Sequence, residues 1–190
     1  MSRSKDFLNY IREKFQSNSV TVLATLTLGL IALLAVQYAE QALFGVMFLV
    51  TVFTAVVVKN IDLRWLGVET ATFATFVMAM ISSPIKAALI GFVLISAQMI
   101  ARQQFGIYIL WVIPSYALMG AIVSIIQPSN IFIAGIAATI GLHLVFTVLT
   151  GLRTPQALSN YMPYAVMNVA FNAILFKLLA SPILNIISAV

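Results

Sequence analysis

Residues 59–80 read KNIDLRWLGVETATFATFVMAM, and this stretch decides the kind of fold that the chain can adopt. It carries four of the fifteen charged residues (ten basic and five acidic) and then continues as an apolar run. The four are Lys59, Asp62, Arg64 and Glu69. Glu69 follows Trp65, a residue type that is enriched at the membrane surface, so Glu69 is expected inside the membrane. A carboxylate is costly there and normally faces protein or water, which makes Glu69 the first candidate for a functional residue.

The composition indicates a membrane protein. Of the 190 residues, 62% are hydrophobic and only 8% are charged, whereas a soluble domain carries about 25% charged residues. The absence of cysteine excludes disulfides, thiolate metal sites and a cysteine nucleophile. The net charge of +5 comes from basic residues scattered between apolar runs, as in the loops of a polytopic protein. We therefore expect the lipid bilayer as a partner and no nucleic acid.

Seven hydrophobic runs follow one another from Val20, each near the 20 or so residues that a membrane-spanning helix needs. Short polar breaks separate them, and these breaks leave no room for a separate soluble domain. The sequence predicts an all-α fold, a polytopic transmembrane helical bundle in a single domain over residues 20–190. The expected spans are 20–38, 41–58, 66–82, 85–101, 107–126, 131–150 and 161–180. The alternative for the last span is that it extends to residue 188.

Residues 1–19 are polar and basic, with a narrow apolar stripe at helical spacing formed by Phe7, Ile11 and Phe15. This pattern predicts a cytoplasmic or interfacial N-terminal segment that lies on the membrane surface. The competing interpretation is a cleaved signal peptide. It is disfavoured because the next apolar run is long and no small-residue cleavage site precedes a polar mature domain.

The basic residues predict the orientation in the membrane. With a cytoplasmic N-terminus, eight of the ten basic residues fall on the cytoplasmic side, as the excess of Lys and Arg in cytoplasmic loops requires. These eight are Arg3, Lys5, Arg12, Lys14, Lys59, Arg64, Arg102 and Arg153, and the other two are Lys86 and Lys177. We expect a multi-pass protein of the cell membrane whose C-terminus lies outside.

Small residues four positions apart predict where helices pack closely. Helix contacts in lipid depend on such residues because they let two backbones approach each other. Ala87 with Gly91 and Gly120 with Ser124 are examples on the fourth and fifth expected spans. Several more pairs occur along the chain, so a compact bundle is expected.

Polar residues inside three expected spans predict one site. Glu69 has Thr72 one turn later, His143 lies between two threonines, and two asparagines lie four residues apart on the last span. If the spans are antiparallel, all three groups lie in the same half of the membrane. The expected solute-contacting residues are Glu69, Thr72, Thr139, His143, Thr147, Asn168 and Asn172. The alternative is that each group satisfies a neighbour and only fixes the register of its helix.

An enzyme is not expected. The chain has one histidine, lacks paired aspartates inside the spans, and contains none of the nucleophile-elbow, zinc-helix or glycine-rich phosphate motifs. Glu69 and His143 alone are too few ligands for a stable metal site. We predict no cofactor and no metal.

Short motifs in residues 41–188 resemble the substrate-binding S components of energy-coupling-factor (ECF) vitamin transporters. The similar stretches are Ile61-Asp-Leu-Arg64, the turn at Ser82-Ser-Pro84, Ala88-Leu-Ile-Gly-Phe92, Tyr116-Ala-Leu-Met-Gly120, Met162-Pro-Tyr-Ala-Val-Met-Asn168 and Phe171-Asn-Ala-Ile-Leu-Phe176. The resemblance implies a six-span core, preceded here by one additional N-terminal span. It also implies a small-molecule solute and a membrane partner protein.

Taken together, the residues and the resemblance predict a small-solute transporter or a solute-binding membrane subunit. The alternative is a non-catalytic membrane scaffold that binds partner proteins, like the cell-shape proteins of the MreD type. Solute binding predicts a polar site that water can reach, whereas a scaffold predicts a dry bundle with apolar contacts to a partner protein or to a second copy in a homo-oligomer.

Overall fold

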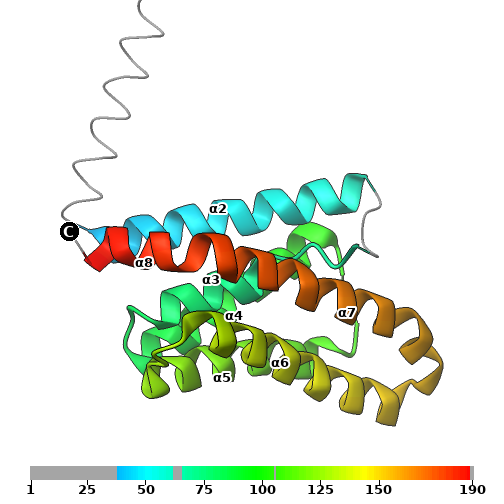
Figure 1. Ribbon diagram of the computed structural model, residues 1–190. Coiled ribbons are helices and arrows are strands. Elements are labelled where there is room, and N and C mark those ends of the chain that lie inside the picture. The colour runs from blue at the N-terminus through cyan, green and yellow to red at the C-terminus, as the bar shows by residue number, and fades with distance from the viewer. Residues whose placement is uncertain (1–37, 62–65, 105, 189–190) are drawn as a thin grey trace, which may run out of the picture. The chain divides into compact units, whose positions relative to one another are not determined.

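The computed structural model describes residues 38–61, 66–104 and 106–188, and these residues contain helices and no strand (Figure 1). Leu43–Val190 form one compact unit, to which the following description applies, together with the first turn of helix α2. The expected N-terminal segment over 1–19 lies outside the described residues. So do Asp62, Arg64, Trp65 and all but the last residue of the expected span over 20–38.

Five helical stretches among the described residues are long and apolar enough to cross a membrane. They contain 18 to 27 residues, and at about 1.5 Å per residue the shortest is about as long as the hydrocarbon core is thick. They are α2 (Ala39–Asn60), α4 (Pro84–Arg102), α5 (Ile109–Ile126), α6 (Ile131–Arg153) and Tyr161–Ile187. The last comprises most of α7 (Leu158–Leu175), the π-helical segment η3 (Phe176–Ala180) and most of α8 (Ser181–Ser188), which are continuous in Figure 1. The all-α fold is thus confirmed among the described residues, and five of the predicted runs form helices that could span a membrane. The predicted total of seven spans is not confirmed.

The third expected span, over 66–82, was predicted wrongly. Its helix, α3, covers only Ala71–Ala79, and nine residues are too few to cross a bilayer. The helix begins late because Gly67 adopts a positive φ of 63°, which ends regular helix there. It ends at Ala79, and the chain turns through residues 80–83 into α4, where Ser83 before Pro84 is extended. All nine residues of α3 are buried. Its apolar composition therefore suits a position inside the protein, and contact with lipid is not needed to explain it.

The ends of the longer helices have local causes. Pro84 occupies the first turn of α4, where its missing N–H is not needed. The Oδ1 atom of Asn130 accepts a hydrogen bond of 3.0 Å from the N–H of Ile133 and so caps α6. Gln103 and Gln127 end α4 and α5 in the left-handed conformation. These short connections place α4, α5 and α6 in alternating directions.

The interior of the unit is closely packed around α3, which contacts α4, α5, α6 and α7. A Cβ atom added to Gly91 would lie 2.5 Å from the carbonyl oxygen of Tyr116, and one added to Gly120 would lie 2.4 Å from that of Ala87. The two glycines therefore let the backbones of α4 and α5 touch. This contact confirms the packing that the small-residue pairs predicted.

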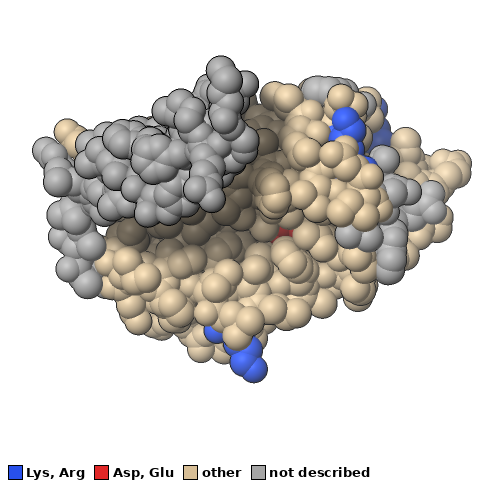
Figure 2. Space-filling model, turned by 90° about the horizontal axis from the view of Figure 1, so that it is seen from above, with Lys and Arg blue, Asp and Glu red and all other residues tan. Residues whose placement is uncertain are grey.

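The outer surface of the described residues is apolar. Only 17% to 33% of the residues in the apolar windows of the five long stretches are buried. Large apolar side chains such as Leu49, Phe53 and Leu89 are exposed, and Figure 2 shows one face on which Lys and Arg lie only towards the edges. A soluble protein rarely exposes so much contiguous apolar area. The surface is consistent with an integral membrane protein.

Candidate functional site: a buried polar cluster around Glu69

Glu69 lies in the non-helical segment that precedes α3, and two contacts fix this segment. Gly67 packs directly against α7, because a Cβ atom at this position would lie 2.3 Å from the backbone nitrogen of Asn168. The buried side chain of Arg102, in the last turn of α4, donates from Nη2 to the carbonyl oxygen of Val68. Since Val68 directly precedes Glu69, this contact also brings a positive charge near the carboxylate.

The Glu69 carboxylate is 4% exposed and accepts hydrogen bonds from four donors. Oε1 accepts from the Tyr116 hydroxyl and, at 3.2 Å, from the Thr72 hydroxyl. Oε2 accepts from the Tyr164 hydroxyl and, at 3.5 Å, from Nδ2 of Asn168. An ionised carboxylate has about four acceptor sites, so these donors occupy them all. The start of α3, two residues further on, adds the positive end of a helix dipole.

Asn168 connects Glu69 to the rest of the cluster, and its side chain is fully buried. Nδ2 donates at 2.8 Å to the carbonyl oxygen of Gly67, a group that can only accept, and this contact fixes the orientation of the amide. Oδ1 therefore faces His143 and Asn172. It lies 2.8 Å from Nε2 of His143 and 3.1 Å from Nδ2 of Asn172.

The tautomer of His143 follows from these roles. Oδ1 of Asn168 can only accept, so Nε2 of His143 carries a proton and donates to it. In the neutral imidazole Nδ1 is then an acceptor, and it lies 2.6 Å from the hydroxyl of Tyr161, which donates. A chain of hydrogen bonds thus runs from Tyr161 through His143 and Asn168 to Glu69.

Aromatic rings surround the polar groups. The ring of His143 lies 5.9 to 6.1 Å, between centroids, from the rings of Phe146, Tyr161 and Tyr164. Tyr116 stacks on Phe146 at 6.3 Å. Tyr116 is buried, whereas Tyr161 and Tyr164 are half-buried. The cluster therefore has an inner side, against α3 and α5, and an outer side formed by the two half-buried tyrosines of α7.

Five of the seven expected site residues belong to this cluster, and two do not. Those in the cluster are Glu69, Thr72, His143, Asn168 and Asn172. The Thr139 hydroxyl instead donates to the carbonyl oxygen of Gly135 in its own helix, at 2.8 Å. Thr147 is directed to the sulfur of Met162, 4.0 Å away. Both threonines were predicted as site residues because each lies four residues from His143. The hydroxyl of Thr139 instead finds its acceptor within α6.

The three tyrosine donors are not among the site residues that the sequence predicted. Tyr116 supplies a hydroxyl from the middle of α5, and Tyr161 and Tyr164 supply two from α7. A signal existed, because a tyrosine inside an apolar span needs a hydrogen-bond partner for its hydroxyl. Tyr116 also lies 47 residues from Glu69, so sequence spacing could not connect them.

Some polar atoms at and around the cluster are buried without a hydrogen-bond partner. They include Nε of Arg102, Oγ1 of Thr70 and Oδ1 of Asn172. Such atoms are costly to leave unmatched and are where a small molecule or water gains most by binding. No group of three or more His, Cys, Asp or Glu side chains gathers within the part of the chain that the structure describes.

Comparison of the chain with protein-family models, with curated protein sequences and with solved structures finds no match.

Proposed function

We propose that this chain is a membrane-embedded solute-binding or transport subunit, without a catalytic role, that takes up a small solute carrying an amine at the Glu69 cluster. The observation that carries the proposal is a carboxylate enclosed by aromatic rings inside a bundle of apolar helices. A carboxylate and aromatic faces together are the chemistry that recognises an organic cation.

The binding energy has a physical source. Neutral hydroxyl and amide groups donate to Glu69. Hydrogen bonds between two charged groups are shorter and about twice as strong as neutral ones, so an ammonium group would replace a hydroxyl favourably. Displaced tyrosine rings would remain beside the cation. The half-buried Tyr161 and Tyr164 give the side from which a solute would enter.

The resemblance to ECF S components supplies a working hypothesis for the partner. In that case the chain would bind the solute and a second membrane protein would supply the energy for uptake. The basic ends of α4 and α6 support an external C-terminus, because Arg102 and Arg153 lie in the last turns of these helices and the final span would start on the same cytoplasmic side.

Thermal unfolding of the detergent-purified protein with matched ligands tests this function. A ligand that binds only the folded state raises its stability by about 2.7 kcal/mol at a hundred times its Kd. We expect primary amines to raise the Tm, and carboxylic acids of the same size to leave it unchanged. The rise should disappear in Glu69→Gln and persist in Glu40→Gln, which removes an acidic residue from the first turn of α2. A rise that survives Glu69→Gln would refute the proposal.

A membrane scaffold of the MreD type is the second candidate. The observation that favours it is that all four acceptor sites of Glu69 are already occupied, as in a cluster that only holds helices together. A scaffold would show no stabilisation by any solute in the unfolding experiment. Instead, chemical cross-linking in membranes would trap a partner protein or a second copy on the exposed apolar faces.

A further inference from the structure

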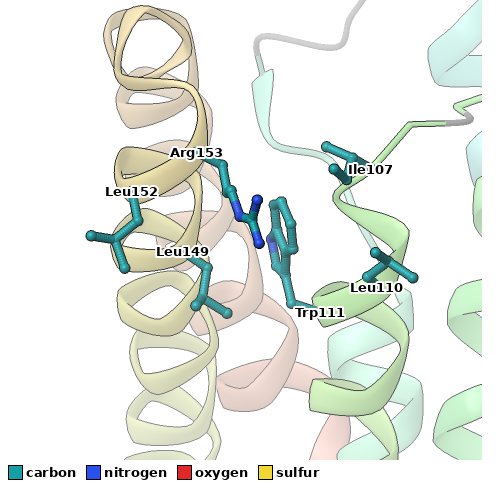
Figure 3. A pocket seen from close by; sticks show the side chains of 6 residues that line it. All are labelled: Ile107, Leu110, Trp111, Leu149, Leu152 and Arg153. Atoms are coloured by element: carbon teal, nitrogen blue, oxygen red, sulfur yellow. The ribbon is translucent and has the colours of Figure 1, made fainter.

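An apolar groove of about 360 Å³ lies between the beginning of α5 and the end of α6, remote in sequence from Glu69 (Figure 3). Its lining consists of four aliphatic side chains, one indole and one guanidinium: Ile107, Leu110, Leu149, Leu152, Trp111 and Arg153. Figure 3 shows the side chains of Trp111 and Arg153 pointing towards each other across the groove. The groove is thus lined mainly by apolar side chains and carries one positively charged group, the guanidinium of Arg153.

The groove lies at one end of the spanning helices. Trp111 is in the first turn of α5, and Arg153 is in the last turn of α6. Tryptophan and arginine are the residue types that anchor helix ends at the level of lipid headgroups. The apolar walls are open to the surroundings, since Leu110 is 73% exposed and Leu152 is 76% exposed. Such walls suit hydrocarbon chains.

The indole nitrogen of Trp111 provides a second polar feature. This Nε1 atom is buried and has no hydrogen-bond partner. A buried donor without an acceptor costs about 1–3 kcal/mol, so an acceptor brought to this place would be held by it. A phosphate oxygen is a suitable acceptor, because the Arg153 guanidinium beside it can bind a second oxygen and supply the charge.

We propose that this groove binds an anionic phospholipid, with an acyl chain along the aliphatic lining and the phosphate between Arg153 and Trp111. The charge of the chain favours this occupant over a second copy of the protein. The whole sequence contains ten basic residues and only five acidic ones. Of the two acidic residues that the structure describes, Glu69 is buried and committed to its own cluster, which leaves Glu40 as the described carboxylate that a second copy could offer to Arg153.

Lipid titration of the full chain, followed by native mass spectrometry, tests the proposal. The probes are phosphatidylglycerol and phosphatidylcholine with identical acyl chains. A basic residue near an anionic headgroup contributes about 1 kcal/mol, so the wild type should bind the first phosphatidylglycerol about fivefold more tightly than phosphatidylcholine. Arg153→Gln should remove this preference. Lys177→Gln, which removes one exposed basic residue from a different helix, should retain it.

Two further variants separate the phosphate contact from the acyl contact. Trp111→Phe retains an aromatic ring but removes the indole N–H. It should weaken binding of both lipids about fivefold, which is the effect of one hydrogen bond. Leu149→Trp fills the groove and should weaken both lipids without abolishing the preference. Circular dichroism spectra and Tm values of each variant should be compared with those of the wild type to check that the variant is folded.

Three results would overturn the proposal. The first is equal binding of the two lipids by the wild type. The second is an equal loss of preference in Arg153→Gln and Lys177→Gln, which would show that only total charge matters. The third is a dimer that light scattering detects in the wild type and that Arg153→Gln dissociates, because the groove would then be occupied by a second copy of the chain.

Discussion

Glu69 and His143 bind opposite atoms of a single side-chain amide, that of Asn168. The carboxylate accepts from Nδ2, and the imidazole donates to Oδ1. A 180° rotation of the amide would place a donor against the N–H of His143 and an acceptor against the carboxylate. Asn168 therefore joins the segment before α3 to α6 with a defined polarity.

The first prediction is that Glu69 and His143 are energetically coupled. A double-mutant cycle with Glu69→Gln and His143→Gln, measured by denaturant unfolding in detergent, should give a coupling of about 0.5–3 kcal/mol, because the residues share one hydrogen-bond network. The control cycle pairs Glu69→Gln with Thr147→Val, which lies outside the cluster and should be additive. Additivity in both cycles would mean that Asn168 does not transmit the effect.

The second prediction is that Gly67 tolerates no side chain. Gly67→Ala should greatly lower the Tm, because its Cβ would overlap the backbone of Asn168 and because φ is 63°. Gly141→Ala is the matched control, since Gly141 is in α6 and has no atom within 4 Å of an added Cβ. It should leave stability unchanged or raise it by up to about 1 kcal/mol through helix propensity. Equal effects of the two substitutions would contradict the close approach of Gly67 to α7.

The third prediction concerns the tyrosine donors. Tyr116→Phe and Tyr164→Phe each remove one hydroxyl from the carboxylate, and each should cost about 1.5–3 kcal/mol, as expected for a hydrogen bond to a charged group. Tyr108→Phe, at the beginning of α5, is the control and should have a small effect. The free energy of unfolding in a denaturing detergent series provides the measurement. If all three variants behave alike, the hydroxyl contacts contribute nothing to stability.

The fourth prediction compares two substitutions of Glu69. Glu69→Gln should fold, because the hydroxyls of Thr72, Tyr116 and Tyr164 can each turn from donor to acceptor towards an amide. Glu69→Lys should accumulate poorly, since it places a cation among groups arranged to donate, with Arg102 nearby. Western blotting of the membrane fraction compares the two. Normal levels of the lysine variant would show that the side chain escapes to the lipid headgroups.

The fifth prediction concerns orientation. Gln103 and Ser129 are exposed and lie at opposite ends of α5, so cysteines at these positions should react from opposite sides of the membrane. With Arg102 and Arg153 on the cytoplasmic side, an impermeant reagent added to intact cells should label Ser129→Cys and spare Gln103→Cys. Labelling of Gln103→Cys alone would reverse the proposed orientation. The cysteine-free wild type is a ready background for both variants.

Hydropathy and length were sufficient to predict the five long helices, because a span that faces lipid must be apolar for about 20 residues. The same rule misassigned α3, since a short helix such as Ala71–Ala79 that is wholly enclosed by protein has the same composition as one that faces lipid. A turn determined by Gly67 could not be distinguished from a tolerated glycine, because the contact that requires it lies on α7.

Within the polar cluster, the sequence predicted the residues that are most costly when isolated in hydrocarbon and did not predict the tyrosines that donate to them. Neighbours one turn apart, such as Asn168 and Asn172, could be paired from spacing alone. Because an isolated polar group is costly in hydrocarbon, the sequence predicted that Glu69 and His143 share one site, and both residues belong to the cluster. The tyrosine donors Tyr116 and Tyr164 could not be paired with Glu69, because only the packing of separate helices brings their hydroxyls to one carboxylate.

The hydrogen bonds of Glu69 have a consequence for biosynthesis. Tyr116 emerges from the ribosome 47 residues after Glu69, and Tyr164 emerges 95 residues after it. When the segment before α3 leaves the translocon, its carboxylate therefore has only Thr72 among its eventual partners. A buried polar group without partners is costly. We therefore expect this segment to reach its final position only after α5 and α7 have been inserted, which would make the centre of the bundle the last part to be completed.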